Sequence, residues 1–140
     1  MKIAFFTEGG IFPTIKRDKI RKWVKLVAAV YDKKIGEVNY IFCSDEKILE
    51  VNREYLQHDY YTDIITFDYS DLDRVSGDLF ISTETVGSNA EKFSTLYEEE
   101  LSRVIIHGVL HLCGQADKTP EEREIMRQKE ELALKMLASL

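Results

Sequence analysis

The residues best suited to chemistry lie in one short stretch near the end of the chain, residues 106–117. His107 and His111 are four residues apart, so on a helix their imidazoles lie one turn apart on the same side, as two ligands of one metal ion must. Gly114 is able to end that helix in a left-handed conformation, after which the chain returns Asp117 toward the same ion. Two histidines and a carboxylate make a three-ligand metal site with room for water.

The spacing alone leaves other interpretations open. Two unrelated histidines also occur four residues apart by chance on amphipathic helices. Gly108 stands where the H-E-x-x-H signature of zinc peptidases has its glutamate base, so that type of peptide hydrolysis is disfavoured. This glycine instead allows a close approach to a sheet or leaves space beside a metal ion. Cys113 lies about 240° round the helix from His107 and is expected to be a core thiol rather than a ligand.

A second polar stretch, residues 51–68, lies where a helix is expected to run into a strand. An ordinary structural explanation is available for its polar residues. Thr62 and Asp63 are turn formers, and Asn52 is suited to hydrogen bonding near the end of a helix. Without further information, these residues carry no function.

The elements that must position these residues follow from the hydrophobic pattern. Strands are predicted at 3–7, 37–43, 63–69 and 77–82, the last two as an antiparallel pair in a mixed sheet. Helices are predicted at 15–34, 45–55, 83–93, 96–113 and 121–137. Gly36 is expected to end the first helix, Ser44 or Asp45 to cap the second, and Thr95 and Thr119, each with a glutamate three residues on, to cap the last two. The fold class is therefore α+β, a mixed four-stranded sheet with packed helices.

Length and composition favour one domain, residues 1–140. A chain of 140 residues with 44% hydrophobic residues is able to bury a core of its own. Its apolar runs are far shorter than the roughly 20 residues of a membrane-spanning helix. An acid at Glu8 comes too early for a secretory apolar segment, and the two cysteines form no CxxC pair. We expect a cytoplasmic protein with reduced thiols and no membrane contact.

The net charge of −6 argues against a nucleic acid partner, but its distribution qualifies that argument. Residues 1–35 hold nine lysines and arginines against three acids, a net charge of +6. Residues 36–140 hold ten against twenty-two, a net charge of −12. The mean charge therefore conceals a polarised molecule with a basic helix face near Lys16–Lys25.

Several motifs together resemble the YbeY family of bacterial rRNA maturation factors, metal-dependent endoribonucleases specific for single strands. The resemblance runs from about Glu37 to the end and is carried by four segments: Val-Asn-Arg-Glu-Tyr at 51–55, Thr-Asp-Ile-Ile-Thr-Phe at 62–67, Gly-Asp-Leu-Phe-Ile at 77–81 and His-Gly-Val-Leu-His-Leu-Cys-Gly at 107–114, followed by Asp117.

This resemblance implies a fold with a zincin-like metal helix and one Zn²⁺ per chain, held by His107, His111 and the residue at position 117. It also implies cleavage of single-stranded rRNA, maturation of the 3′ end of small-subunit rRNA, and ribosome quality control on ribosomal particles in the cytoplasm. The metal would activate water or polarise the scissile phosphate. Candidate substrate-binding residues are Arg53, Tyr55, Thr62 and Asp63, with Tyr60 or Tyr61 also available for base stacking. The basic face near Lys16–Lys25 is a further candidate for holding RNA, although an ordinary solvated helix surface has the same composition.

Two departures from the family pattern qualify these implications. The family has a third histidine at position 117, where this chain has an aspartate, and a carboxylate ligand shifts preference toward harder cations such as Mn²⁺. Leu56 stands where the family commonly has an arginine that engages RNA, and Arg53, one turn earlier, is a candidate substitute. The alternative function is a non-catalytic ribosome-assembly factor with a structural metal site.

Overall fold

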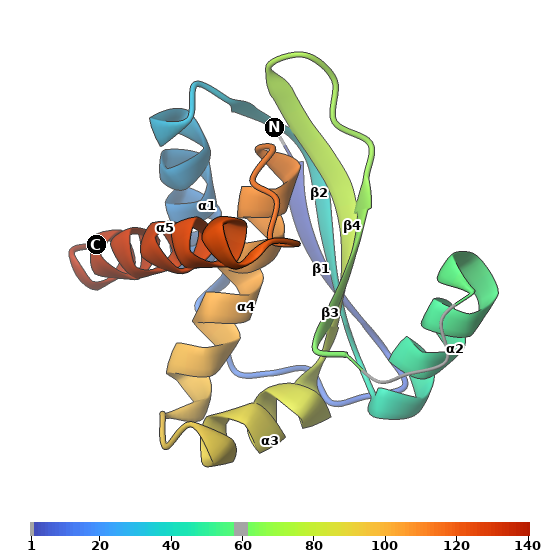
Figure 1. The fold of residues 1–140 in the computed structure, drawn as a ribbon. Helices are drawn as coiled ribbons and strands as arrows, with labels where there is room; N and C mark the ends of the chain where they lie inside the picture. The colour runs from blue at the N-terminus through green and yellow to red at the C-terminus, as the bar shows by residue number, and fades with distance from the viewer. Residues whose placement is uncertain (1, 58–61) are drawn as a thin grey trace.

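The computed structural model describes residues 2–57 and 62–140, which form one four-stranded sheet and five helices (Figure 1). The sheet order is β1-β2-β4-β3. β1 with β2 and β2 with β4 are parallel pairs, whereas β3 and β4 are antiparallel, so the predicted mixed sheet with its antiparallel pair is confirmed. The strands are β1 (Lys2–Glu8), β2 (Lys34–Cys43), β3 (Ile64–Asp68) and β4 (Arg74–Ser82).

The helices divide unequally between the two faces of the sheet. Figure 1 shows α1, α4 and α5 together on one side, α2 on the other, and α3 near one end of the sheet. Of the helices in the described ranges, none is long and apolar enough to cross a membrane. The helices are α1 (Arg17–Val30), α2 (Asp45–Leu56), α3 (Thr83–Lys92), α4 (Tyr97–Leu112) and α5 (Pro120–Ala138).

Two apolar clusters of different size hold these layers together. The large one lies under α1, α4 and α5, where the Trp23 indole donates a hydrogen bond to the carbonyl of Ala133 at 2.7 Å and so joins α1 to α5. Tyr40 of β2 donates in the same way to the Ile105 carbonyl of α4 at 3.3 Å. The small cluster lies under α2 and is made of Cys43, Ile48, Val51 and Ile65. The helix that carries the histidines is therefore fixed to the larger core.

The predicted end of the first helix is wrong. The helix ends at Val30 rather than residue 34, in a turn where Asp32 has a positive φ of 59°. Gly36 lies inside β2, beside a register shift between β2 and β4. A Cβ at Gly36 would lie 2.8 Å from Cγ of Arg74, so this glycine serves the close approach of two strands and not a helix end.

Of the two predicted threonine caps, Thr119 of α5 is confirmed and Thr95 of α4 is wrong. Thr119 and Glu122 form a full capping box with Pro120 at the first helical position, as expected. Thr95 is not a cap: α4 begins one residue later, with Leu96 at the N-cap and no side-chain hydrogen bond there. The Thr95 amide instead donates to the carbonyl of Ala90 at 2.9 Å, closing the turn after α3. Three glutamates in the first turn of α4 interact favourably with the helix dipole in place of the cap.

Gly108 lies where α4 packs closely against the sheet, as predicted. A Cβ at this position would lie 2.9 Å from Cδ1 of Ile64 and 3.0 Å from a Cδ of Leu79. Both distances are too short for an added methyl group unless the ends of the Ile64 and Leu79 side chains shift, so α4 is in close contact with β3 and β4 here. The close contact lies next to His107 on the helix that carries both histidines.

Candidate metal centre

His107 and His111 lie on the side of α4 next to its buried stripe. Leu101, Val104, Ile105, Gly108 and Leu112 of that stripe pack into the large core, which fixes the rotation of the helix. The two imidazole rings then meet one turn apart, with centroids 4.5 Å from each other and planes at 85°. The helical pair expected from the spacing is therefore present.

The turn after α4 brings Asp117 to the histidines. Gly114 has a φ of +100°, and the chain closes with two hydrogen bonds, from the Gly114 amide to the carbonyl of His111 at 2.9 Å and from the Gln115 amide to the carbonyl of Leu110 at 3.0 Å. This pair of bonds is the Schellman arrangement that ends many helices. As a result, Oδ2 of Asp117 lies 3.3 Å from Nε2 of both His107 and His111.

The three side chains fit a divalent metal ion. One ligand atom from each lies within 4.8 Å of the other two. Two atoms that each bind a tetrahedral zinc ion at about 2.0–2.1 Å are about 3.3 Å apart, which matches both histidine–carboxylate distances. The side chains of His107, His111 and Asp117 are 18%, 27% and 35% exposed, so one side of the cluster is open to solvent.

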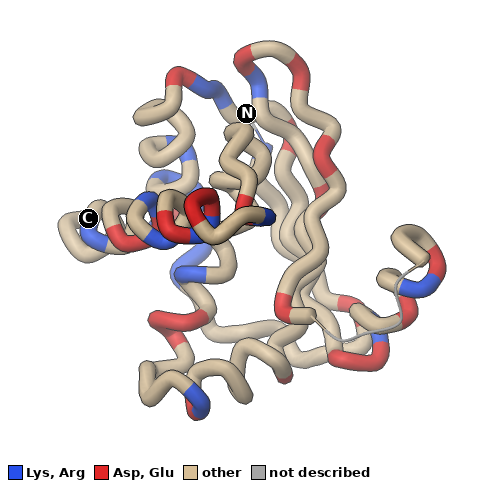
Figure 2. Tube along the Cα trace, in the orientation of Figure 1, with Lys and Arg blue, Asp and Glu red and all other residues tan. Residues whose placement is uncertain are grey.

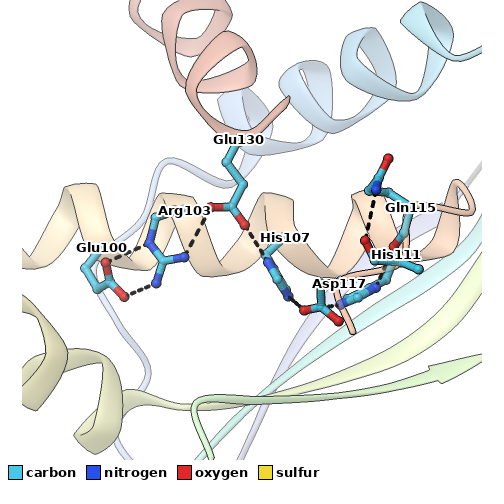
Figure 3. Close-up of polar contacts among 8 residues, drawn as sticks. Glu100, Arg103, His107, His111, Gln115, Asp117 and Glu130 are labelled. Carbon is cyan, nitrogen blue, oxygen red and sulfur yellow. Dashed lines mark hydrogen bonds and ion pairs between the residues drawn. The ribbon is translucent and has the colours of Figure 1, made fainter. Parts of the chain in front are cut away.

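Each histidine has a hydrogen-bond partner at its other ring nitrogen (Figure 3). Nδ1 of His111 lies 2.8 Å from the carbonyl oxygen of Gln115, and Nδ1 of His107 lies against Oε2 of Glu130 on α5. A carbonyl and a carboxylate only accept hydrogen bonds, so both Nδ1 atoms carry the proton. When the rings are neutral, both Nε2 atoms therefore present lone pairs to the cluster, as metal ligands do.

Glu130 belongs to a chain of charged side chains that links α5 to α4. Its Oε1 accepts a hydrogen bond from Arg103 at 3.2 Å, and Arg103 also binds Glu100 through two of its nitrogens (Figure 3). The hydrogen bond to Glu100 raises the pKa of Arg103, outweighing the opposing effect of burial. Burial lowers the pKa of His107, but the hydrogen bond and charge of Glu130, together with the charges of Asp117 and Asp63, raise this pKa above its usual value.

Two hollows meet at the cluster. One, of about 440 Å³, runs between α4 and α5 and is lined by His107, Asp117 and Arg103 among others. The other, of about 260 Å³, is lined by His111, Asp117 and the turn between α4 and α5. The open side of the cluster therefore gives access to a ligand larger than water.

The predicted substrate-binding residues do not all lie near the cluster. Asp63 is close enough to Arg103 and His107 to interact with their charges, and burial raises the pKa of its carboxyl group. Thr62 donates a hydrogen bond to the Ile64 carbonyl at 3.4 Å, as a turn residue does. Arg53 and Tyr55 lie on α2, on the opposite face of the sheet. Tyr60 and Tyr61 are outside the described residues.

The surroundings of Arg53 and Tyr55 differ. Arg53 lines a surface hollow on α2 together with three glutamates, Glu46, Glu50 and Glu54. The Tyr55 ring is 62% exposed and contacts Phe67 of β3 edge to face, with centroids 5.9 Å apart. Tyr55 therefore offers an exposed ring that is held on one side.

The predicted basic face on α1 is present but partly engaged. Figure 2 shows basic residues along α1, whereas both signs of charge alternate along α5. Arg21 donates to the carbonyl of Ile3 at 3.0 Å and pairs with Asp18 at 2.8 Å, and the Arg17 guanidinium lies 4.3 Å from the centroid of the Phe12 ring. Lys22 and Lys25 are exposed.

Cys113 is partly buried against the large apolar core, as expected for a core thiol. Its thiol is absent from the cluster formed by the histidines and Asp117, and burial raises its pKa to about 11. Such a thiol stays protonated at neutral pH, whereas a thiolate is what binds zinc.

The sequence interpretation missed Glu130, Arg103 and Glu100. Met126, Glu130 and Ala133 are the buried residues of α5, spaced by four and three positions. A glutamate in the apolar stripe of a helix was the signal available for Glu130. Glu100 follows Glu98 and Glu99 in the first turn, so it looked like one more acid at a helix start.

Comparisons with known proteins agree with the geometry. The model of the family described as "Endoribonuclease YbeY" matches residues 12–138. Curated proteins named "Endoribonuclease YbeY" from Bacteroides fragilis, Bacteroides thetaiotaomicron and Porphyromonas gingivalis are 65%, 62% and 54% identical, each over 97% of this chain and over 98%, 99% and 90% of their own lengths. A solution structure of TM1509 from Thermotoga maritima superimposes with a TM-score of 0.65 at 26% identity, over 98% of this chain and 92% of that one.

Proposed function

This chain belongs to the YbeY family of endoribonucleases, and we propose that it cuts single-stranded ribosomal RNA with a divalent metal ion held by His107, His111 and Asp117. The observation that carries the proposal is the pair of 3.3 Å distances from Asp117 to the two Nε2 atoms, which suit ligands of one tetrahedral ion. The ion we propose is zinc, one per chain. The carboxylate ligand makes Mn²⁺ the principal competitor.

When bound, the metal supplies positive charge for the scissile phosphate and for an attacking water. The chain's own residues hold it in place. His107 and His111 donate neutral nitrogen atoms from a rigid helix, and Asp117 adds one negative charge from the turn. The open side of the cluster admits the phosphate, and the large apolar core behind α4 keeps the two imidazoles at a fixed separation.

Substrate contacts are the second part of the proposal. We propose that Asp63 and Thr62, at the start of β3, contact RNA near the metal, and that Tyr55 and Arg53 contact it farther along the strand. RNA that follows this path passes round β3, which is an edge strand of the sheet. Tyr55 has the exposed ring that base stacking requires.

The cellular role follows from the family. We propose that residues 1–140 act as a single domain in the cytoplasm, on ribosomal particles, in the 3′-end maturation of small-subunit rRNA and in ribosome quality control. The alternative of a non-catalytic assembly factor is not favoured, because the curated relatives are named as endoribonucleases. Peptide hydrolysis remains disfavoured by Gly108, which leaves no glutamate after His107.

The deciding experiment compares His111→Ala with the wild type in cleavage of single-stranded rRNA by purified protein. The variant loses one of three ligands, and we expect cleavage to fall about 1000-fold, since a metal ion contributes several kcal/mol and each factor of ten corresponds to about 1.4 kcal/mol. Chelator treatment of the wild type is expected to abolish cleavage, and added Zn²⁺ or Mn²⁺ to restore it. Full activity in the variant would mean that another nuclease cuts the RNA.

A further inference from the structure

Glu130 is an unusual residue for its position. On the 19-residue helix α5 the buried residues are Met126, Glu130 and Ala133, and Glu130 is only 4% exposed. Burying a carboxylate is costly unless each oxygen finds a partner. The structural question is therefore which of its two partners, Arg103 or His107, accounts for its presence.

Arg103 alone does not explain the carboxylate. This guanidinium already makes two hydrogen bonds to Glu100, which is 3% exposed and on the same helix. Glu130 adds a second buried carboxylate to one partly buried cation, so the three side chains carry a net charge of −1. An ion pair between α4 and α5 would be complete with one glutamate fewer. The surplus negative charge lies against His107.

The second carboxylate oxygen of Glu130 contacts His107. Oε2 lies against Nδ1 of His107, and Nε2 of the same ring lies 3.3 Å from Asp117, inside the cluster (Figure 3). A proton held on Nδ1 keeps the lone pair on Nε2, because a neutral imidazole carries one N–H. The carboxylate also makes the ring a more basic ligand.

We propose that Glu130 is a positioning residue that holds the metal-ligating tautomer of His107, and that Arg103 and Glu100 hold Glu130 in place. The inference rests on the proposed metal centre and adds to it a group that does not touch the metal. His111 has a neutral partner for the same purpose, the carbonyl of Gln115. The two ligands therefore differ in the charge behind them, and His107 is the more strongly held.

Glu130→Gln is the informative change because it alters hydrogen bonding at nearly constant shape. Arg103 only donates, so it keeps the amide oxygen of the glutamine facing it. The amide NH₂ group then faces Nδ1 of His107 and requires a lone pair there, which moves the ring proton to Nε2. We expect zinc affinity, measured by competition with a chromophoric chelator, to fall about 10- to 100-fold.

The matched control is Glu131→Gln. Residue 131 is next along α5 and exposed, so the variant loses the same charge without changing a contact to His107. Zinc affinity within twofold of the wild type is expected for this control. If Glu131→Gln weakens zinc as much as Glu130→Gln does, general electrostatics explains both variants and the proposal is wrong.

A spectroscopic measurement separates positioning from packing. Long-range ¹H–¹⁵N spectra of metal-free protein report which imidazole nitrogen carries the proton. We expect Nδ1–H for His107 in the wild type and Nε2–H in Glu130→Gln. A neutral wild-type ring that carries its proton on Nε2 alone would overturn the proposal without any variant, even if Glu130→Gln fails to fold.

The zinc-affinity and tautomer measurements test the role of Glu130 separately from the nuclease assay. Loss of zinc affinity with the tautomer change supports the inference whether or not His111→Ala removes nuclease activity. Conversely, an inactive His111→Ala with unchanged zinc binding in Glu130→Gln supports the proposed function and rejects the role of Glu130. A fall in thermal stability with unchanged tautomer and zinc affinity assigns Glu130 to helix packing alone.

Discussion

The metal cluster and the candidate RNA contacts on α2 lie on opposite faces of one sheet and are built differently. At the cluster, both histidines and the carboxylates behind them have defined partners, and α4 rests on the large core. On α2 the core beneath is a cluster of four residues, and Tyr55 is 62% exposed. Chemistry that needs ligands placed within a fraction of an ångström sits on the rigid side, whereas contact with a flexible strand tolerates exposed groups.

Burying polar groups near the metal cluster costs free energy, and this cost explains why each of them is hydrogen-bonded to a neighbour. Buried polar groups are stabilising only when every donor and acceptor is satisfied. In the described part of the chain, no buried side-chain nitrogen or oxygen lacks a hydrogen-bond partner. Removing one member of the cluster therefore has consequences for its neighbours. Removing the exposed Tyr55 ring on α2 affects its contact with Phe67 and whatever that ring binds.

The largest effect is expected at Asp117. Asp117→Ala removes the third ligand, and zinc affinity should fall by more than about 100-fold, because loss of an outer partner alone accounts for about 10- to 100-fold. Elemental analysis of purified protein and chelator competition measure this directly. Unchanged metal content would show that Asp117 does not bind the metal ion and that the proposed three-ligand site is wrong.

Asp117→His sharpens the same test. It restores the three-histidine pattern implied by the family resemblance and replaces an oxygen ligand by nitrogen. We expect zinc to be retained and the preference for Mn²⁺ relative to Zn²⁺ to fall, since imidazole suits zinc better than manganese. A variant with the same relative preference as the wild type would show that the carboxylate does not set metal choice.

A smaller effect is expected on the α2 side. Tyr55→Ala should weaken binding of single-stranded RNA by about 1 kcal/mol, the lower end of what one base stacked on an aromatic ring contributes. This corresponds to about a fivefold rise in Kd with zinc content unchanged. Fluorescence anisotropy with a labelled oligonucleotide measures it.

Tyr69→Ala is the matched control for Tyr55. Tyr69 is also 62% exposed, but it lies directly after β3 and not on α2. Equal losses in the two variants would remove any special role from Tyr55. A change in zinc content in Tyr55→Ala would contradict the separation of the two faces.

The predictability of the two regions from sequence also differs. His107, His111, Gly114 and Asp117 lie within eleven residues, so helix periodicity and one glycine turn were enough to bring them together. Glu130 comes from another helix, and its pairing with His107 depends on how α5 crosses α4, which no local pattern encodes. Long-range packing decides such contacts.

The errors in the fold have the same origin. Gly36 looked like a helix stop because its role, a close approach to Arg74, comes from a strand far away in the sequence. Thr95 looked like a cap, but the turn after α3 uses its amide and delays the helix by one residue. Thr119, whose capping box involves only its own helix, was predicted correctly.

The smallest effect is expected on α1. Of the basic residues proposed to face RNA, Arg21 is already bound to Ile3 and Asp18, so the exposed Lys22 and Lys25 are the stronger candidates. Each phosphate contact on a single strand contributes about 0.7 to the slope of log affinity against log salt. The double variant Lys22→Gln/Lys25→Gln should therefore lower that slope by about 1.4 at most, with little change in sequence preference.

Adding changes at Lys19 and Arg21 to this double variant tests whether the whole basic face takes part. If Arg21 serves structure, the quadruple variant loses thermal stability, through the lost contact to Ile3, while its salt slope changes little beyond that of the double variant. Lys135→Gln, an exposed lysine in the last turn of α5, controls for the loss of one positive charge elsewhere. A salt slope equal to that of the wild type in the quadruple variant would show that α1 does not contact RNA. Because the net charge of −6 already disfavours non-specific binding, recognition would then depend on the metal centre and on the α2 side.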